Sequence, residues 1–401
     1  MSRRTVVVVG ASVAGVNAVE ELRKAGFDGR VVLVGAEPHF PYDRPPLSKQ
    51  LLVGQMEPAD LALRTSAEFA ALDVELRLGV RATRLDVGKR VAGLSDGTDV
   101  CFAGAIVATG ASARRLPGQP SAAGLHALRT LDDALALRSA LCPSHRVLVI
   151  GAGFIGAEVA SSAIALGCQV TVVEAAPQPM ARVLGSEVGA RFATLLRAHG
   201  ADVLLGVEVS ELLLEENEFA GIRLRDGRTL RADVCVVGVG ARPNVDWLAG
   251  SELVVSDGLV CDSRLRAVPR IYGAGDVVSC GGLRLEHWSS AREQGRLAAA
   301  NLVAELRGMI GELREHNTVP YFWSDQFGVK VQLAGIAAGS DRTWAHDHEG
   351  GLAVLFRRAG RLGAAMTWNR PAELARLRRM IDSGTSFDAA VAWTQDWHRT
   401  I

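Results

Sequence analysis

The stretch VVVVGASVAG (residues 6–15) runs four valines into a glycine-rich turn, and VLVIGAGFIG (residues 147–156) repeats this pattern 141 residues later. Each turn has small residues at three fixed positions: Gly10, Ser12 and Gly15 in the first, and Gly151, Gly153 and Gly156 in the second. The first position permits a tight turn, the second lets a pyrophosphate approach the backbone, and the third lets the next helix pack close to the strand. Helix-forming stretches follow at 16–25 and 157–166, so both segments predict a strand–turn–helix unit that binds a dinucleotide phosphate.

A second strand follows each predicted helix and ends near an acidic residue. Glu37 closes RVVLVGAE, 22 residues after Gly15, and Glu174 closes QVTVVE, 18 residues after Gly156. These spacings are close to the roughly 20 residues expected for the acid that binds a ribose hydroxyl. Such an acid would repel a 2′-phosphate, so both sites are predicted to prefer a dinucleotide without one. A solvated acid is the alternative, which stays more open for Glu37, since Ala36 could equally end its strand.

Composition limits the remaining function classes. A chain of 401 residues is too long for one core and should form two or three domains. Its 44 acidic and 44 basic side chains balance, which gives no general attraction to nucleic acid or membrane. Six scattered cysteines without a CxxC pair predict reduced thiols, no metal site and a cytoplasmic location. The first strand begins almost at once, which leaves no room for a signal peptide, and no uninterrupted 18-residue apolar span predicts a membrane helix.

The order of the predicted elements gives an α/β fold, with two Rossmann-like dinucleotide-binding domains and a C-terminal α+β domain. The predicted domains are 1–112 with 241–317, then 113–240, and finally 318–401. We expect the first domain to be discontinuous because the strand RIYGAGDVV (270–278) suits its cofactor. The third domain has shorter strands, VKVQLAG and GLAVLFRR, before a helix at 371–382.

Two further segments carry candidate binding residues. Asp276, beside Gly275 at the end of a predicted strand, could bind a cofactor hydroxyl while the next helix faces the pyrophosphate, or it could cap that helix. The segment FPYDRPPLSK (40–49) contains three prolines that are expected to keep it extended and stiff. Arg44 and Lys49 would then present cations to a cofactor, although a surface loop with solvated charges is an equal alternative.

Several motifs together identify a family. The two glycine-rich turns, PYDRPPLSK, IVATGA, LRTLDDALALR, GARPN, YGAGDV, EHWSSAREQG and VPYFWSDQFG occur in this order along nearly the whole chain. This pattern resembles the FAD-dependent NADH:ferredoxin reductases of the putidaredoxin reductase family, which serve bacterial cytochrome P450 and ring-hydroxylating dioxygenase systems. The resemblance implies a glutathione-reductase-like fold with an FAD domain, an inserted NADH domain and a C-terminal domain that helps to dock an acidic iron–sulfur ferredoxin. It mildly favours a monomer.

The resemblance also assigns residues. The positions expected at FAD are Gly10, Ser12, Ala14, Gly15, Glu37, Arg44, Lys49, Ala82, Thr109, Gly110, Arg129, Gly275, Asp276 and Trp288. Those expected at NADH are Gly151, Gly153, Ile155, Gly156, Glu158, Glu174 and Gly240. Lys49 and Glu158 match an ion pair beside the flavin N5, where a cation would favour the reduced flavin. Ser12 departs from the family glycine, so we expect altered contact with FAD rather than loss of the site.

Electron exit is predicted from an absence and from a few exposed candidates. Tyr42 and Asp43 stand where related disulfide reductases and NADH oxidases need cysteine, so electrons should leave the flavin without a thiol relay. Trp323 matches a family tryptophan near the flavin edge, although an aromatic in an apolar run is more often core. The predicted dock for the ferredoxin uses Arg296, Arg376 and Arg379, with Arg370 and Arg378 nearby. A solvated helix face is about as plausible for any single arginine.

Other functions remain open at this point. A rubredoxin reductase or a slow NADH oxidase would need the same two binding sites. A redox-gated flavoprotein resembling apoptosis-inducing factor would bind a partner rather than turn over rapidly.

Overall fold

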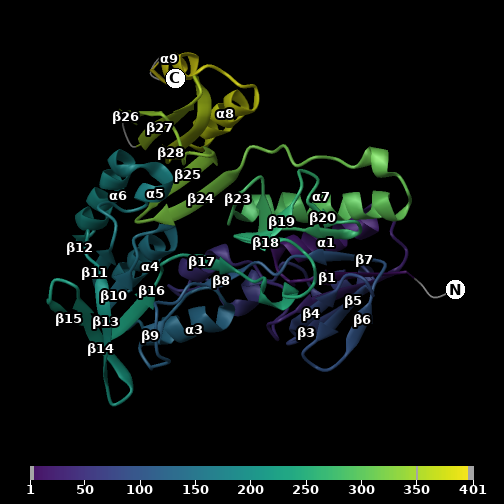
Figure 1. Cartoon of the computed structure of the whole chain (residues 1–401). Helices are drawn as coiled ribbons and strands as arrows, with labels where there is room; N and C mark the ends of the chain where they lie inside the picture. Colours follow the sequence, from purple (N-terminus) through teal and green to yellow (C-terminus); the bar gives the residue numbers. More distant parts are fainter. Residues whose placement is uncertain (1–3, 349–350, 396–401) are drawn as a thin grey trace. The chain divides into compact units, whose positions relative to one another are not determined.

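The computed structural model describes residues 4–348 and 351–395 and forms two compact units (Figure 1). Unit 1 takes its described residues from 1–43, 59–112 and 241–318, and unit 2 takes them from 44–58, 113–240 and 319–401. The residues predicted as the second and third domains thus gather in one unit, and the three-domain division stays a prediction. None of the helices in the described ranges combines the length and apolar character that a membrane span needs.

Unit 1 is built on a six-stranded sheet in the order β20-β21-β7-β1-β2-β3. Its strands are β1 (Thr5–Val9), β2 (Arg30–Gly35), β3 (Val74–Leu78), β7 (Gly104–Val107), β20 (Arg266–Val268) and β21 (Ile271–Gly273). β20 runs antiparallel to β21, and the other neighbours pair in parallel. The side chains of Val6–Val9 are at most 3% exposed, because a parallel sheet is covered on both faces.

Smaller elements complete unit 1. One sheet joins β4 (Ala82–Asp86), β5 (Val91–Leu94) and β6 (Asp99–Cys101), and another joins β18 (Val255–Ser256), β19 (Gly258–Cys261), β22 (Val278–Cys280) and β23 (Leu283–Arg284). β8 (Ala111–Ala113) pairs with β17 (Ala241–Pro243). Short helices are α2 (Ser66–Ala71), η2 (Pro58–Leu61), η3 (Asp246–Leu248) and η4 (Ile310–Glu312).

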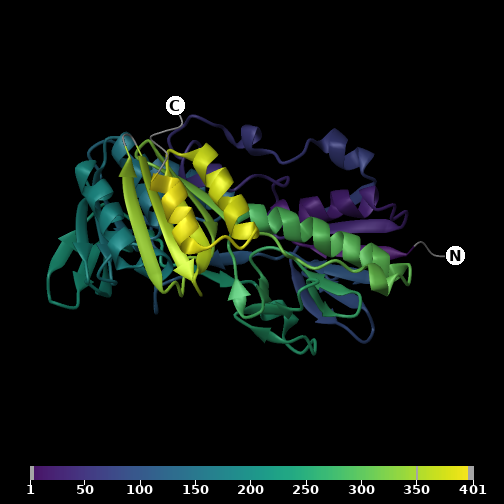
Figure 2. The same cartoon turned by 90° about the horizontal axis from the view of Figure 1, so that it is seen from above.

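Helices α1 (Val13–Lys24) and α7 (Trp288–Leu306) lie side by side in unit 1 (Figures 1 and 2). Their backbones approach so closely that a Cβ added at Gly295 would lie 2.2 Å from the Ala14 carbonyl oxygen. Near the same point, the Gly275 N–H donates to the Gln294 side chain at 2.8 Å. This close packing fixes the beginning of α1, where the first glycine-rich turn lies.

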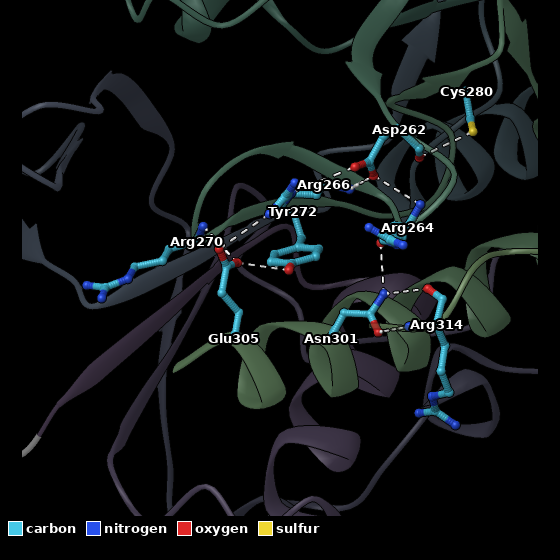
Figure 3. Close-up of polar contacts among 9 residues, drawn as sticks. All are labelled: Asp262, Arg264, Arg266, Arg270, Tyr272, Cys280, Asn301, Glu305 and Arg314. Atoms are coloured by element: carbon cyan, nitrogen blue, oxygen red, sulfur yellow. Dashed lines mark hydrogen bonds and ion pairs between the residues drawn. The ribbon is translucent and has the colours of Figure 1, made fainter. Parts of the chain in front are cut away.

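A polar network at the other half of α7 fixes that helix against the sheet (Figure 3). The buried Glu305 carboxylate accepts hydrogen bonds from the Tyr272 hydroxyl at 2.9 Å and the Arg270 N–H at 3.0 Å. Burial raises the pKa of Tyr272, which keeps the hydroxyl protonated as a donor. The Asn301 amide donates to the carbonyl oxygens of Arg264 and Arg314 at 2.9 Å and 2.8 Å. These bonds satisfy buried polar groups and hold α7 in one position.

Unit 2 contains a five-stranded parallel sheet in the order β12-β11-β10-β16-β9. The strands are β9 (Leu125–His126), β10 (Arg146–Ile150), β11 (Gln169–Glu174), β12 (Asp202–Leu205) and β16 (Val234–Val237). The helices of this part are α3 (Leu131–Ala140), α4 (Phe154–Ala165), α5 (Ala181–Leu184) and α6 (Ser186–Ala198). A three-stranded sheet joins β13 (Val209–Glu215), β14 (Glu218–Leu224) and β15 (Thr229–Arg231). The second glycine-rich turn therefore follows the central strand of a parallel sheet, as the sequence predicts.

The C-terminal part of unit 2 is an antiparallel sheet in the order β24-β25-β28-β27-β26, with two helices. Its elements are β24 (Tyr321–Gln326), β25 (Val329–Gly335), β26 (Arg342–His348), β27 (Gly351–Arg358), β28 (Arg361–Trp368), α8 (Pro371–Asp382) and α9 (Phe387–Gln395). Figure 2 shows α8 and α9 against one face of this sheet. The other face meets α4 and α6, where Phe322 packs on Phe154 with ring centroids 4.5 Å apart. This shared apolar core explains why the predicted second and third domains gather in one unit.

The predicted elements are confirmed in kind but differ at their ends. Helices α1 and α4 begin at Val13 and Phe154, three residues before the predicted starts, because the glycine-rich turn itself forms the first helical turn. The strands predicted at VKVQLAG and GLAVLFRR and the helix at 371–382 are present as β25, β27 and α8. The α/β fold with a C-terminal α+β part is confirmed.

Candidate functional site

The first and third glycines of both turns are required by the protein itself. A Cβ added at Gly10, where φ is +120°, would lie 2.0 Å from the Ala108 oxygen, and one at Gly15 would lie 1.8 Å from the Gly10 oxygen. The second turn repeats these contacts: a Cβ at Gly151 would lie 2.4 Å from the Gly238 oxygen, and one at Gly156 would lie 2.1 Å from the Gly151 oxygen. These four glycines are therefore explained by tight turning and close packing without any ligand.

The middle position is different. A Cβ added at Gly153 would meet nothing within 4 Å, and the φ of this residue is −76°. The protein leaves open space beside the backbone here, at the start of α4, where the first N–H groups of a helix lack intrahelical partners. A dinucleotide pyrophosphate fits that space and those donors. Ser12 occupies the same N-cap position in α1, and its side chain makes no capping hydrogen bond to the helix.

Glu174 lies where a ribose-binding acid is needed. It is the last residue of β11, and its two carboxylate oxygens accept the N–H groups of Ala152 and Ala176, each at 2.8 Å. One of these donors belongs to the glycine-rich turn, so the carboxylate is held against that turn. The geometry fits the predicted contact with the adenosine ribose of an NADH molecule.

Glu37 is held differently. β2 ends at Gly35, so neither Ala36 nor Glu37 ends the strand, and the acid lies two residues beyond it. Its carboxylate accepts the Tyr42 hydroxyl at 2.5 Å. The carboxylate is thus oriented by the proline-rich segment rather than by the first glycine-rich turn.

Asp276 follows β21 as predicted, but the interpretation of what comes next is wrong. The following residues form β22, and α7 begins only at Trp288, with His287 as its N-cap residue. Asp276 therefore caps no helix, and no helix N-terminus comes directly after it. Gly275 adopts a φ of +79°, which a side chain would strain, and its position beside Ala14 brings Asp276 to the first glycine-rich turn.

His287 is a structural residue at this site. Burial lowers its pKa to about 4, against a smaller opposite effect of Asp276. The imidazole is therefore neutral at physiological pH. This agrees with the expectation that hydride transfer needs no general base here.

Asn244 fixes the loop at Thr109 and Gly110. Its side-chain amide donates to the Thr109 oxygen at 2.9 Å, and its backbone N–H donates to the Gly110 oxygen at 2.9 Å. The Thr109 hydroxyl donates back to the Asn244 oxygen at 2.8 Å. The GARPN motif thus has a structural use that the sequence interpretation missed.

The prediction that segment 40–49 is extended is wrong. Residues 45–48 form a 3-10 helix, because Pro45 and Pro46 have the fixed φ that suits the first positions of a helical turn. Within unit 1, the Trp288 indole donates to the Asp43 carboxylate at 2.6 Å. Within unit 2, the Arg44 guanidinium donates to the Arg129 carbonyl oxygen. Both predicted arginines are thereby placed together.

Lys49 and Glu158 form the predicted ion pair in unit 2. The Lys49 Nζ lies 3.0 Å from Glu158 Oε1, and the two side chains are 11% and 3% exposed. The same carboxylate accepts the Ser324 hydroxyl at 2.6 Å and the Ser48 hydroxyl at its other oxygen. Neither serine was predicted as a site residue.

The exit candidates lie on one face of β24 and on α8. Trp323 stacks with Tyr321, with ring centroids 6.0 Å apart, and the Arg378 guanidinium lies 5.8 Å from the Tyr321 ring. Arg376 lies over Trp393 at 4.9 Å. In unit 1, the Arg296 guanidinium donates to Asn17 at 3.0 Å. The predicted docking residues thus occur in both units, and Arg376 and Arg296 each have a structural contact.

The chain matches two family models. The description "Pyridine nucleotide-disulphide oxidoreductase" covers residues 4–295, and "Reductase C-terminal" covers residues 321–397. The ferredoxin–NAD(+) reductase component of the p-cumate 2,3-dioxygenase system of Pseudomonas putida is 34% identical over 392 residues, which is 96% of this chain and 94% of that protein. A rubredoxin–NAD(+) reductase of Pseudomonas putida is 34% identical over 376 residues, which is 91% of this chain and 96% of that protein.

Solved structures agree with this relationship. The reductase in the covalent putidaredoxin reductase–putidaredoxin complex superimposes with a TM-score of 0.90 at 30% identity, over 96% of this chain and 94% of that chain. The glutathione-reductase-like fold implied by the sequence is therefore confirmed. The chain belongs to the pyridine nucleotide-disulphide oxidoreductase family and carries its reductase C-terminal domain.

Proposed function

We propose that this chain is a ferredoxin–NAD(+) reductase that passes electrons from NADH through FAD to a small iron–sulfur ferredoxin. The ferredoxin would supply a cytochrome P450 or a ring-hydroxylating oxygenase. The observation that supports this best is the presence of two strand–turn–helix sites in one chain, in which Gly153 leaves open space and Glu174 lies beside its turn. When bound, FAD accepts a hydride from NADH and can release the two electrons one at a time.

FAD would bind along the first glycine-rich turn. The proposed contacts are Gly10, Ser12, Ala14, Gly15, Glu37, Arg44, Lys49, Ala82, Thr109, Gly110, Arg129, Gly275, Asp276 and Trp288. Asn244 and Asp43 support this set by fixing the Thr109–Gly110 loop and the Trp288 indole. The beginning of α1 supplies helix N–H groups for the pyrophosphate.

NADH would bind along the second turn. The proposed contacts are Gly151, Gly153, Ile155, Gly156, Glu158, Glu174 and Gly240. Ile155 is 47% exposed beside the turn, which is unusual for a large apolar side chain and suits contact with a ligand. Because the Glu174 carboxylate would repel a 2′-phosphate, we propose a preference for NADH over NADPH.

The Lys49–Glu158 pair would lie beside the flavin where hydride arrives. Glu158 holds the Lys49 ammonium at 3.0 Å in surroundings that exclude most water. A cation in such surroundings acts strongly on a nearby flavin, because solvent screening is weak. It would favour the reduced form of the cofactor.

Electrons would leave toward Trp323, with the ferredoxin docked by Arg296, Arg376 and Arg379. The first cysteine of the chain is Cys101, so segment 40–49 offers no thiol relay and the acceptor would take electrons from the flavin itself. Arginine at the surface would attract an acidic partner and speed its encounter. A cytoplasmic location and a monomeric state belong to the same proposal.

A reconstituted electron-transfer assay tests the function. The purified yellow protein is mixed with NADH, a [2Fe–2S] ferredoxin and cytochrome c as reporter. We expect cytochrome c reduction that requires both NADH and the ferredoxin. Loss of this requirement, with NADH consumed equally fast in the absence of the ferredoxin, would favour an NADH oxidase.

A rubredoxin reductase is the second candidate, because one relative with that name is 34% identical. The same assay with rubredoxin in place of ferredoxin separates the two. Faster reduction of rubredoxin at equal concentration would assign the chain to that group.

A further inference from the structure

We propose that Ser48 and Ser324 are positioning residues that hold the Glu158 carboxylate from two sides and so fix the direction of the Lys49 ammonium. This inference rests on the proposed function, in which Lys49 lies beside the flavin. It concerns unit 2 alone, since all four residues belong to that unit.

The carboxylate has a donor on each oxygen. Glu158 Oε1 receives the Lys49 ammonium at 3.0 Å and the Ser324 hydroxyl at 2.6 Å, and Oε2 receives the Ser48 hydroxyl. A carboxylate held by a lysine alone can rotate about its last bond, but donors on both oxygens fix its plane. The direction of the lysine is then fixed as well.

Burial makes these hydroxyls necessary. Glu158, Ser48 and Ser324 are 2%, 3% and 0% exposed, so water cannot readily replace a missing donor. A buried ion pair is stable only when hydrogen bonds satisfy the remaining lone pairs of its oxygens. The two serines meet that need without adding charge to the site.

Each serine is itself held in place. The Ser162 hydroxyl donates to the Ser48 carbonyl oxygen at 2.7 Å, and the Gln326 amide donates to the Ser324 hydroxyl oxygen at 2.9 Å. The Ser48 segment is also tied by Arg138, whose guanidinium lies 3.0 Å from the Glu57 carboxylate. The donors are therefore rigid, as positioning requires.

The placement on β24 explains how one strand can serve two purposes. Side chains alternate along a strand, so Ser324 and Gln326 face Glu158 whereas Tyr321 and Trp323 face the other side. The strand that presents the proposed exit tryptophan thus also fixes the proposed hydride-transfer pair. Ser48 has the matching place next to Lys49 in sequence.

The test compares Ser324→Ala and Ser48→Ala with wild type in the FAD-loaded protein. We expect each change to slow flavin reduction by NADH about tenfold, since small displacements of a positioned group cost rates of this size. Each should also lower the midpoint potential of the bound FAD by up to about 30 mV, which corresponds to a tenfold change in a two-electron equilibrium. The potential is a readout that does not depend on turnover.

Two controls separate positioning from damage to the fold. Ser324→Thr keeps the hydroxyl and should restore the potential. Thr367→Val removes a buried hydroxyl from the same sheet, one that bonds the Arg370 carbonyl oxygen and not Glu158, and should leave both readouts unchanged.

A double-mutant cycle gives the decisive comparison. In a Glu158→Gln background, Ser324→Ala should change the potential no further, because the serine acts through that carboxylate. Wild-type potentials in both alanine variants, with normal reduction of wild type by NADH, would overturn the inference. Failure of NADH to reduce even the wild-type flavin would instead overturn the proposed function.

Discussion

The two glycine-rich turns are the same in their packing and different in what they offer a ligand. In both, Cβ atoms added at the first and third positions would collide with backbone oxygens, at distances of 1.8–2.4 Å. At the middle position, Ser12 stands in one turn and Gly153, with open space around it, stands in the other. The acids differ too, since Glu174 bonds to its own turn whereas Glu37 bonds to Tyr42.

This difference separates what the fold needs from what the ligand needs. The fold requires the outer two glycines, and substituting them should damage the protein before any binding is measured. The middle residue and the acid make no comparable demand on packing. Their effects should therefore appear in cofactor binding and selectivity.

The largest effect is expected from Gly156→Ala. The added methyl group would lie 2.1 Å from the Gly151 oxygen and would push α4 away from β10. We expect a loss of about 2–3 kcal/mol in the free energy of unfolding, as for other overpacked sites. Urea denaturation of the purified protein measures it, and an unchanged midpoint would contradict the packing argument.

Gly153→Ala is the matched change three residues earlier. Its methyl group enters open space, so the free energy of unfolding should stay within about 0.5 kcal/mol of wild type. NADH binding should weaken about tenfold, because the methyl group occupies the approach of the pyrophosphate. Titration of the oxidised protein with NAD(+) gives the dissociation constant, and equal affinity would show that this space is not the binding site.

Glu174→Gln should narrow the preference for NADH over NADPH by about tenfold, the size of one charged hydrogen bond. The amide retains an oxygen for one of the two backbone N–H groups and removes the repulsion of a 2′-phosphate. The ratio of kcat/KM for the two cofactors measures the change. Glu37→Gln is the control, which should leave that ratio unaltered because Glu37 belongs to the other site.

The smallest effect is expected from Ser12→Gly. Glycine is nearly as good as serine at an N-cap, so α1 should lose only a few tenths of a kcal/mol. FAD affinity should change by less than about threefold, since the backbone N–H groups of the turn remain. Fluorescence of released FAD follows this, and complete loss of the flavin would show that the Ser12 side chain is essential to binding.

Local pattern and tertiary contact divide what the sequence could predict. Both glycine-rich turns, Glu174 and the Lys49–Glu158 pair were predicted, because each lies in a short motif of fixed spacing. Ser48 and Ser324 were missed, since they reach Glu158 from positions 110 and 166 residues away. The strand that follows Asp276 and the 3-10 helix at 45–48 were also missed, because glycine and proline permit several turn types.

Rapid mixing of the FAD-loaded protein with NADH, and separately with NADPH, tests the central claim that the second turn delivers hydride to a flavin held by the first. We predict fast bleaching of the flavin by NADH, much slower bleaching by NADPH, and rapid return of the yellow colour without oxygen when oxidised ferredoxin is added. A flavin that stays oxidised with NADH, or a reduced flavin that ferredoxin cannot reoxidise, would contradict the account.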